Sequence, residues 1–105
     1  MNIKFGYLYR DAGNYKSWGE IVFANPSKLS PERIESLMRK RLFAGEYFVA
    51  KDVKVPSLFF AIFDPELDHS WHEFSHIEET EELPNDIVER TIEEFVVDLN
   101  QPFVK

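Results

Sequence analysis

Residues 64–82 read DPELDHSWHEFSHIEETEE, and this stretch decides how the rest of the chain can be arranged. It holds all three histidines of the chain, His69, His72 and His76. On a helix, the four-residue spacing would place His72 and His76 on one face, as the H-E-x-x-H zinc pattern requires. On a strand, positions 72, 74 and 76 would share one face and positions 71, 73, 75 and 77 the other. The same two histidines would then lie about 13 Å apart.

The helical alternative predicts a minimal zinc-dependent hydrolase. His72 and His76 would bind the ion, and Glu73 would be the base that activates a metal-bound water. A third protein ligand would come from a downstream glutamate or from the remaining histidine: Glu94, Glu93 or His69. The strand alternative predicts polar histidines on a solvated or interfacial strand, too far apart to share one metal ion.

Length and composition limit the chain to one modest domain. Its 105 residues predict a single domain spanning residues 1–105, with no room for a catalytic and a regulatory unit together. The absence of cysteine excludes a disulfide scaffold and any thiolate site. Residues 1–13 do not resemble a signal peptide, and the longest apolar run, residues 58–63, is too short to span a bilayer. We therefore expect a cytoplasmic protein that binds no membrane.

Charge is divided unevenly along the chain. Residues 1–63 carry ten Lys and Arg against six Asp and Glu, a net charge of +4, whereas residues 64–105 carry two against thirteen, a net charge of −11. The two halves either face each other and partly neutralise, or form a bipolar surface that pairs with a second copy or a basic partner. The overall charge of −7 disfavours nucleic acid. It also counts against metal-free RNA cleavage by His72, Glu73 and either Arg10 or Lys16.

The alternation of side chains predicts a hairpin at the start of the chain. Apolar residues at positions 3, 5, 7 and 9 are typical of a strand with one buried face. Residues 11–14, DAGN, favour a turn because Gly and Asn tolerate positive φ, and residues 16–23 predict a second strand. Residues 46–50 predict a short strand. Residues 58–63 are apolar on both faces, which fits a buried strand or a short helical turn.

Four short strings in these segments carry a family resemblance. They are YLYRDA at residues 7–12, NYK at 14–16, GEIVF at 19–23 and DHSWHEF at 68–74. Together they resemble a group of small bacterial proteins with no known activity, over about residues 7–78. The resemblance implies a bacterial origin and no particular function. The shared pattern includes Trp71, His72, Glu73 and Phe74 but not His76, which counts against the zinc alternative.

A first amphipathic helix is predicted after residue 30. Ser30 is a suitable N-cap and Pro31 suits the first helical position. The apolar stripe comprises Ile34, Leu37, Met38 and Leu42. Gly45 is a plausible stop. The cations of this segment lie largely off the stripe and form either a solvated cluster or an anion-binding patch: Arg33, Arg39, Lys40 and Arg41.

A second amphipathic helix is predicted from residue 86. Asp86 followed three residues later by Glu89 has the form of a capping box. The apolar face would comprise Ile87, Val88, Ile92, Phe95, Val96 and Leu99. Pro102 would end the helix.

Together these elements predict an α+β fold, with an antiparallel sheet of about four strands and two amphipathic helices packed on one face. The chain offers no complete catalytic set outside the zinc alternative, in which zinc is the cofactor. The function expected from the strand alternative is a small, non-enzymatic cytoplasmic protein that binds a partner protein or a second copy of itself. The binding surface would comprise Asp68, His69, Trp71, His72 and Glu73. Trp71 would be its anchor, because large aromatic side chains dominate protein interfaces.

Overall fold

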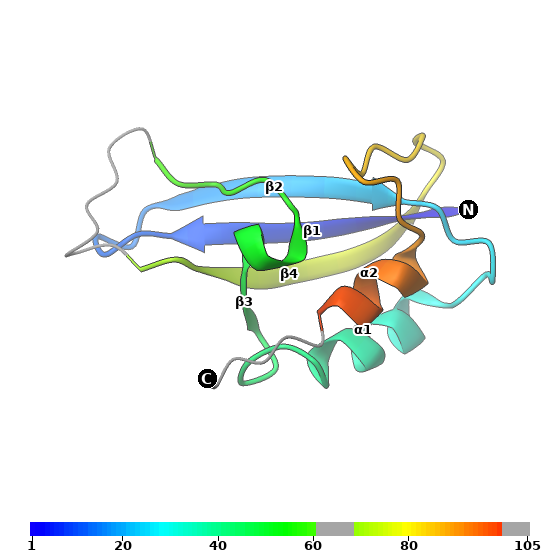
Figure 1. Ribbon diagram of the computed structural model, residues 1–105, viewed down its shortest axis with the longest axis horizontal. Helices are drawn as coiled ribbons and strands as arrows, with labels where there is room; N and C mark the ends of the chain where they lie inside the picture. The colour runs from blue at the N-terminus through cyan, green and yellow to red at the C-terminus, as the bar shows by residue number, and fades with distance from the viewer. Residues whose placement is uncertain (61–68, 100–105) are drawn as a thin grey trace.

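A computed structural model describes residues 1–60 and 69–99 of the chain. These residues form one antiparallel sheet of four strands in the order β2-β1-β4-β3 (Figure 1). The strands are β1 (Asn2–Arg10), β2 (Lys16–Phe23), β3 (Tyr47–Val49) and β4 (Trp71–Thr80). The helices α1 (Pro31–Arg39) and α2 (Ile92–Asp98) complete an α+β fold, as predicted. Residues 71–80 are therefore a strand, and the helix that the H-E-x-x-H pattern needs is not formed.

The central strand β1 pairs differently with its two neighbours. Its pairing with β2 is regular over its whole length, from Ile3 opposite Phe23 to Arg10 opposite Lys16. Its pairing with β4 contains a bulge, because Gly6 lies opposite His76 whereas the next residue, Tyr7, lies opposite Phe74. Residue 75 is thus an extra residue on β4, and a bulge of this kind changes which face the following side chains occupy.

The bulge corrects the predicted assignment of faces. We call the face of the sheet that carries Phe5 and Tyr7 the inner face, and the opposite one the outer face. Directly opposed residues share a face, so His72, opposite Tyr9, is on the inner face and His76, opposite Gly6, is on the outer one. The simple alternation expected from the sequence put both histidines on the same face, and was wrong because it did not include the extra residue.

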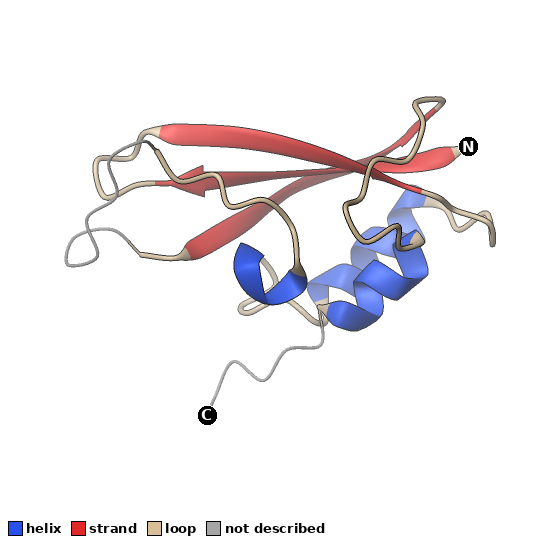
Figure 2. Ribbon diagram, turned by 45° about the horizontal axis from the view of Figure 1, so that its top comes forward, coloured by secondary structure: helices blue, strands red, loops and turns tan. Residues whose placement is uncertain are grey.

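The inner face supplies the hydrophobic core. The Phe95 ring of α2 lies 5.0 Å from the Phe5 ring and 4.5 Å from the Phe23 ring, measured between centroids. Ile34 and Met38 of α1 are fully buried in the same cluster. Figures 1 and 2 show the two helices side by side near the end of the sheet where β1 begins. Neither described helix has the length and apolar character needed to cross a membrane.

The first helix begins as predicted, but the second begins five residues later than predicted, with Thr91 in place of Asp86 as its N-cap. The Ser30 hydroxyl accepts a hydrogen bond from the Arg33 amide and caps α1. In α2 the capping box is formed by Thr91 and Glu94. Residues 86–90 are not helical: Ile87 is 74% exposed, and Glu89 has a φ of 55°, outside the helical range.

A buried ion pair explains why Asp86 does not cap α2. The guanidinium of Arg90 donates to both carboxylate oxygens of Asp86, at 2.9 and 3.0 Å, so Asp86 binds a side chain instead of capping a helix. The same guanidinium donates to the carbonyls of Val53 and Lys54, at 2.7 and 3.2 Å. It therefore ties the short 3₁₀ turn Ala50–Val53 to the segment that leads into α2.

The segment after this turn crosses the inner face. The Tyr7 hydroxyl donates to the Pro56 carbonyl at 2.7 Å, and Leu58 packs where Gly19 leaves room on β2. Residues 58–60 are in neither a strand nor a helix, so that part of the predicted strand or helical turn is wrong. The rest of it, residues 61–63, lies outside the described residues. At the edge of the sheet, the Asn85 side chain accepts from the Val22 amide, and the Asn85 amide donates to the Val22 carbonyl.

Candidate functional site

His72, the first histidine of the H-E-x-x-H string, is fully buried in the core. Its Nε2 accepts a hydrogen bond from the Leu58 amide at 3.0 Å, so the ring proton is on Nδ1, which donates to the Ser70 carbonyl at 3.2 Å. The rings of Tyr9 and Phe59 lie within 5.4 Å of the imidazole, measured between centroids. Burial lowers the pKa of His72 below its usual value. Both ring nitrogens are already hydrogen-bonded to backbone groups, so the side chain has a structural role.

The other members of the zinc alternative lie elsewhere. His76 is exposed on the outer face, and Glu94 closes the capping box of α2 by accepting from the Thr91 amide at 2.9 Å. Glu73, the expected base, receives two hydrogen bonds from the Arg10 guanidinium, at 2.9 and 3.3 Å. The structure thus does not bring His72, His76 and Glu94 together, and we derive no zinc chemistry from the H-E-x-x-H match. Nor does it join His72 to the Arg10–Glu73 pair, as RNA cleavage would need.

Trp71 lies at the start of β4 and forms one wall of an open pocket. Its indole stacks on the Phe43 ring, with centroids 5.2 Å apart and planes inclined by 28°. The pocket holds about 280 Å³, and the residues that line it within the described part of the chain all bear rings: Phe43, Tyr47, His69 and Trp71. Phe43 is 48% exposed although it is large and apolar. We call this feature the Trp71 pocket.

Local backbone structure assembles the Trp71 pocket. Strand β3 pairs with β4 so that Tyr47 lies opposite Glu73. A tight turn folds Phe43 back onto Tyr47, with two backbone hydrogen bonds of 2.9 Å between them. Ala44 and Gly45 in this turn both have positive φ, of 53° and 73°. Gly45 therefore belongs to this turn and does not itself end α1, whose last residue is Arg39.

Acidic side chains lie near Tyr47, one of the residues that line the Trp71 pocket. The charge of Glu46, followed by desolvation and then by the charge of Glu73, raises the pKa of the Tyr47 hydroxyl. Arg10 offsets part of this field through its pair with Glu73, and its guanidinium also donates to the Asn14 side chain at 2.6 Å. A negative field beside exposed aromatic rings favours an apolar or cationic ligand group over an anionic one.

The predicted binding residues divide between the two faces of β4. Trp71 and His69 line the pocket, and Glu73 lies across from Tyr47. His72 points into the core instead, which corrects its assignment to the binding surface. Asp68 lies outside the described residues. Sequence reasoning missed Phe43 and Tyr47 as site residues, because only the turn at 44–45 and the pairing with β4 bring them to Trp71.

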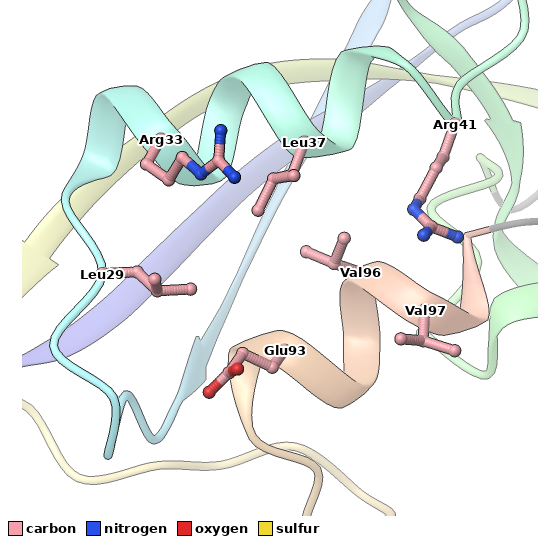
Figure 3. A pocket seen from close by; sticks show the side chains of 7 residues that line it. All are labelled: Leu29, Arg33, Leu37, Arg41, Glu93, Val96 and Val97. Atoms are coloured by element: carbon pink, nitrogen blue, oxygen red, sulfur yellow. The ribbon is translucent and has the colours of Figure 1, made fainter.

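A second hollow lies between the two helices (Figure 3). It holds about 310 Å³, and its lining combines aliphatic and charged side chains: Leu29, Arg33, Leu37, Arg41, Glu93, Val96 and Val97. The predicted cationic cluster is split here, because Arg39 instead pairs with Glu35 at 2.9 Å and donates to the Gly45 carbonyl. Glu93 accepts from the Ser27 hydroxyl. This groove mixes both charge signs, whereas the described residues that line the Trp71 pocket all bear rings.

Comparisons with known proteins assign no family. No protein-family model, curated protein or solved structure matches the chain.

Proposed function

We propose that the protein is a small, non-enzymatic cytoplasmic domain that binds another protein, with the Trp71 pocket as its recognition site. The observation that carries the proposal is the stack of the exposed Phe43 ring on the partly exposed Trp71 ring around an apolar hollow. Most large aromatic side chains of the sheet are instead buried, as Phe5 and Tyr7 are. Aromatic side chains that are left half-exposed around a pocket are the usual anchors of protein interfaces.

The partner that fits this pocket presents an apolar side chain next to a lysine or arginine. Glu46, together with the part of the Glu73 charge that Arg10 does not offset, raises the pKa of Tyr47, and residues 64–105 carry a net charge of −11. Opposite charge speeds encounter and excludes wrong partners, whereas two copies of this chain would bring like charges together. We therefore favour a basic partner segment over self-association.

The proposal can be tested with the two tryptophans as a matched pair. Trp18 is 60% exposed but lies on the outer face of β2, away from the Trp71 pocket. The probes are arrayed synthetic peptides that pair an apolar residue with Lys or Arg, and a matched series with Glu in place of each cation. We expect the wild-type protein and Trp18→Ala to retain the basic series preferentially, and Trp71→Ala to lose it.

Two results would count against this assignment. Equal peptide retention by Trp71→Ala and Trp18→Ala would show that the Trp71 pocket is not the site. Preference for the Glu series would show that the charge argument is wrong. Sedimentation velocity on the same three proteins tests self-association: a dimer that Trp71→Ala dissociates would replace the basic partner by a second copy.

A further inference from the structure

Glu20, His76 and Glu78 converge on the outer face of the sheet, away from the Trp71 pocket. Nε2 of His76 lies 3.7 Å from a carboxylate oxygen of Glu20 and 3.7 Å from one of Glu78. One ligand atom from each of the three residues lies within 4.8 Å of the other two. These separations are too long for hydrogen bonds. The two separations from Nε2 of His76 are only slightly longer than the roughly 3.4 Å between neighbouring ligand atoms around a tetrahedral zinc ion, so the two carboxylates need only close in further to bind one ion.

Two features of the backbone aim His76 at this point. The bulge at residue 75 turns its side chain to the outer face, and bulges are a common way to re-aim a side chain. Gly6, which lies between Glu20 and His76 in the sheet, leaves the space that the imidazole occupies. A Cβ at position 6 would lie 2.2 Å from Cε1 of His76. The ring therefore extends over β1 towards Glu20 on β2.

The second ring nitrogen of His76 has a polar neighbour that could hold the ring while the first nitrogen binds a metal ion. Nδ1 lies 3.1 Å from the Ser75 hydroxyl. If Nε2 binds a metal ion, Nδ1–H can donate to the Ser75 hydroxyl, and this hydrogen bond would fix the ring orientation. Metal-binding histidines almost always have such a partner for their second nitrogen.

The local charge suits a divalent cation. Lys4 also faces this area, but its ammonium forms an ion pair with Glu82, so these two charges offset each other. Glu20 and Glu78 place two carboxylates beside the imidazole. A hollow of about 190 Å³ beside them, lined in part by Trp18 and Gly19, has room for waters that complete the coordination.

We propose that Glu20, His76 and Glu78 bind one Zn²⁺ ion, with water in the remaining coordination positions. An imidazole with two carboxylates suits Zn²⁺ better than Mg²⁺, which prefers oxygen ligands. The bound ion would join β2 to β4 across the central strand. This site shares only His76 with the H-E-x-x-H string, and it is independent of the Trp71 pocket.

Isothermal titration of the untagged, metal-free protein with Zn²⁺ tests the proposal. We expect about one equivalent to bind and the thermal midpoint to rise, because a ligand that binds only the folded state stabilises it. His76→Ala should weaken Zn²⁺ binding by about tenfold or more, and Glu78→Gln should weaken it in the same direction. His69→Ala is the matched control, since His69 is also exposed but lies outside the cluster, and it should bind as the wild type does.

The outcomes separate clearly. Titration with Mg²⁺ should give no comparable binding. The proposal is overturned if the wild-type protein takes up no Zn²⁺, or if His76→Ala and Glu78→Gln bind it as tightly as His69→Ala does. Circular dichroism of the metal-free variants checks that they fold; because all three ligands are exposed, we expect native spectra. Should one variant misfold, the other still decides the question.

Discussion

His72 and His76 are four residues apart on the same strand, yet they lie in opposite environments. His72 is fully buried, with both ring nitrogens bonded to backbone, whereas His76 is exposed between two carboxylates. One extra residue on β4 accounts for this difference, because it changes the face to which the later residues point. A short motif can therefore act as a chemical unit only where the backbone places its side chains on a common face.

The largest contrast between the faces is expected from removing one large aromatic side chain from each. Phe5→Ala on the inner face should lower the free energy of unfolding by about 3–5 kcal/mol, because it leaves a cavity among buried rings. Trp18→Ala on the outer face should lower it by less than about 1 kcal/mol, since the indole is 60% exposed. Urea unfolding followed by circular dichroism gives both values; similar losses would mean that the outer face is also covered.

A smaller contrast is expected at the two glycines that face opposite sides of the sheet. At Gly19 an added Cβ would lie 2.9 Å from Leu58 and 3.3 Å from the buried Tyr7 ring, so Gly19→Ala strains the inner face. At Gly6 the Cβ would meet only the exposed His76 ring, which can swing into solvent. We expect Gly19→Ala to be less stable than Gly6→Ala by about 1 kcal/mol.

The same pair of glycine variants has a second readout. Gly6→Ala should lose Zn²⁺ binding while it keeps its stability, because the imidazole is displaced from the carboxylates. Gly19→Ala, by contrast, should lose stability. If Gly6→Ala binds Zn²⁺ as the wild type does, the space above β1 does not position His76.

The smallest effect is expected from pH. The pKa of His72 is lowered in the folded state, so the unfolded chain takes up a proton more readily than the folded protein does. Stability should therefore fall as the pH drops below about 6.5, the usual histidine value, and before the carboxylates titrate. Urea midpoints at pH 7 and pH 5 measure this change. His72→Gln should flatten the dependence, and the control His76→Gln should retain it; a slope unchanged in His72→Gln would contradict the assignment.

Much of the fold follows from local sequence patterns. Alternation in residues 3–9 predicted β1, and Ser30 with Pro31 predicted the start of α1. The start of α2 was mispredicted because Asp86 with Glu89 and Thr91 with Glu94 both have the capping-box form. Arg90 determines which of the two capping boxes forms, because its side chain bonds to the carbonyls of Val53 and Lys54. These two residues are distant from Arg90 in the sequence, so no local pattern indicates the contact.

The candidate site was only partly predictable for the same reason. Trp71 could be chosen from the sequence as a large aromatic residue in an acidic segment. Phe43 could not, because its exposure depends on the positive-φ turn at Ala44 and Gly45. The bulge on β4 has no local signal either, since it is defined by the pairing with β1 and not by residues 74–76 alone.

The contact of Asn85 with β2 has a consequence for aggregation. An edge strand with free amides and carbonyls is a template for pairing with other chains. The Asn85 side chain and amide occupy both backbone groups of Val22, as a neighbouring strand would. At the opposite edge, β3 is only three residues long. We therefore expect the main effect of replacing Asn85 to be aggregation through the exposed edge of β2, and a loss of folding stability to be the lesser effect.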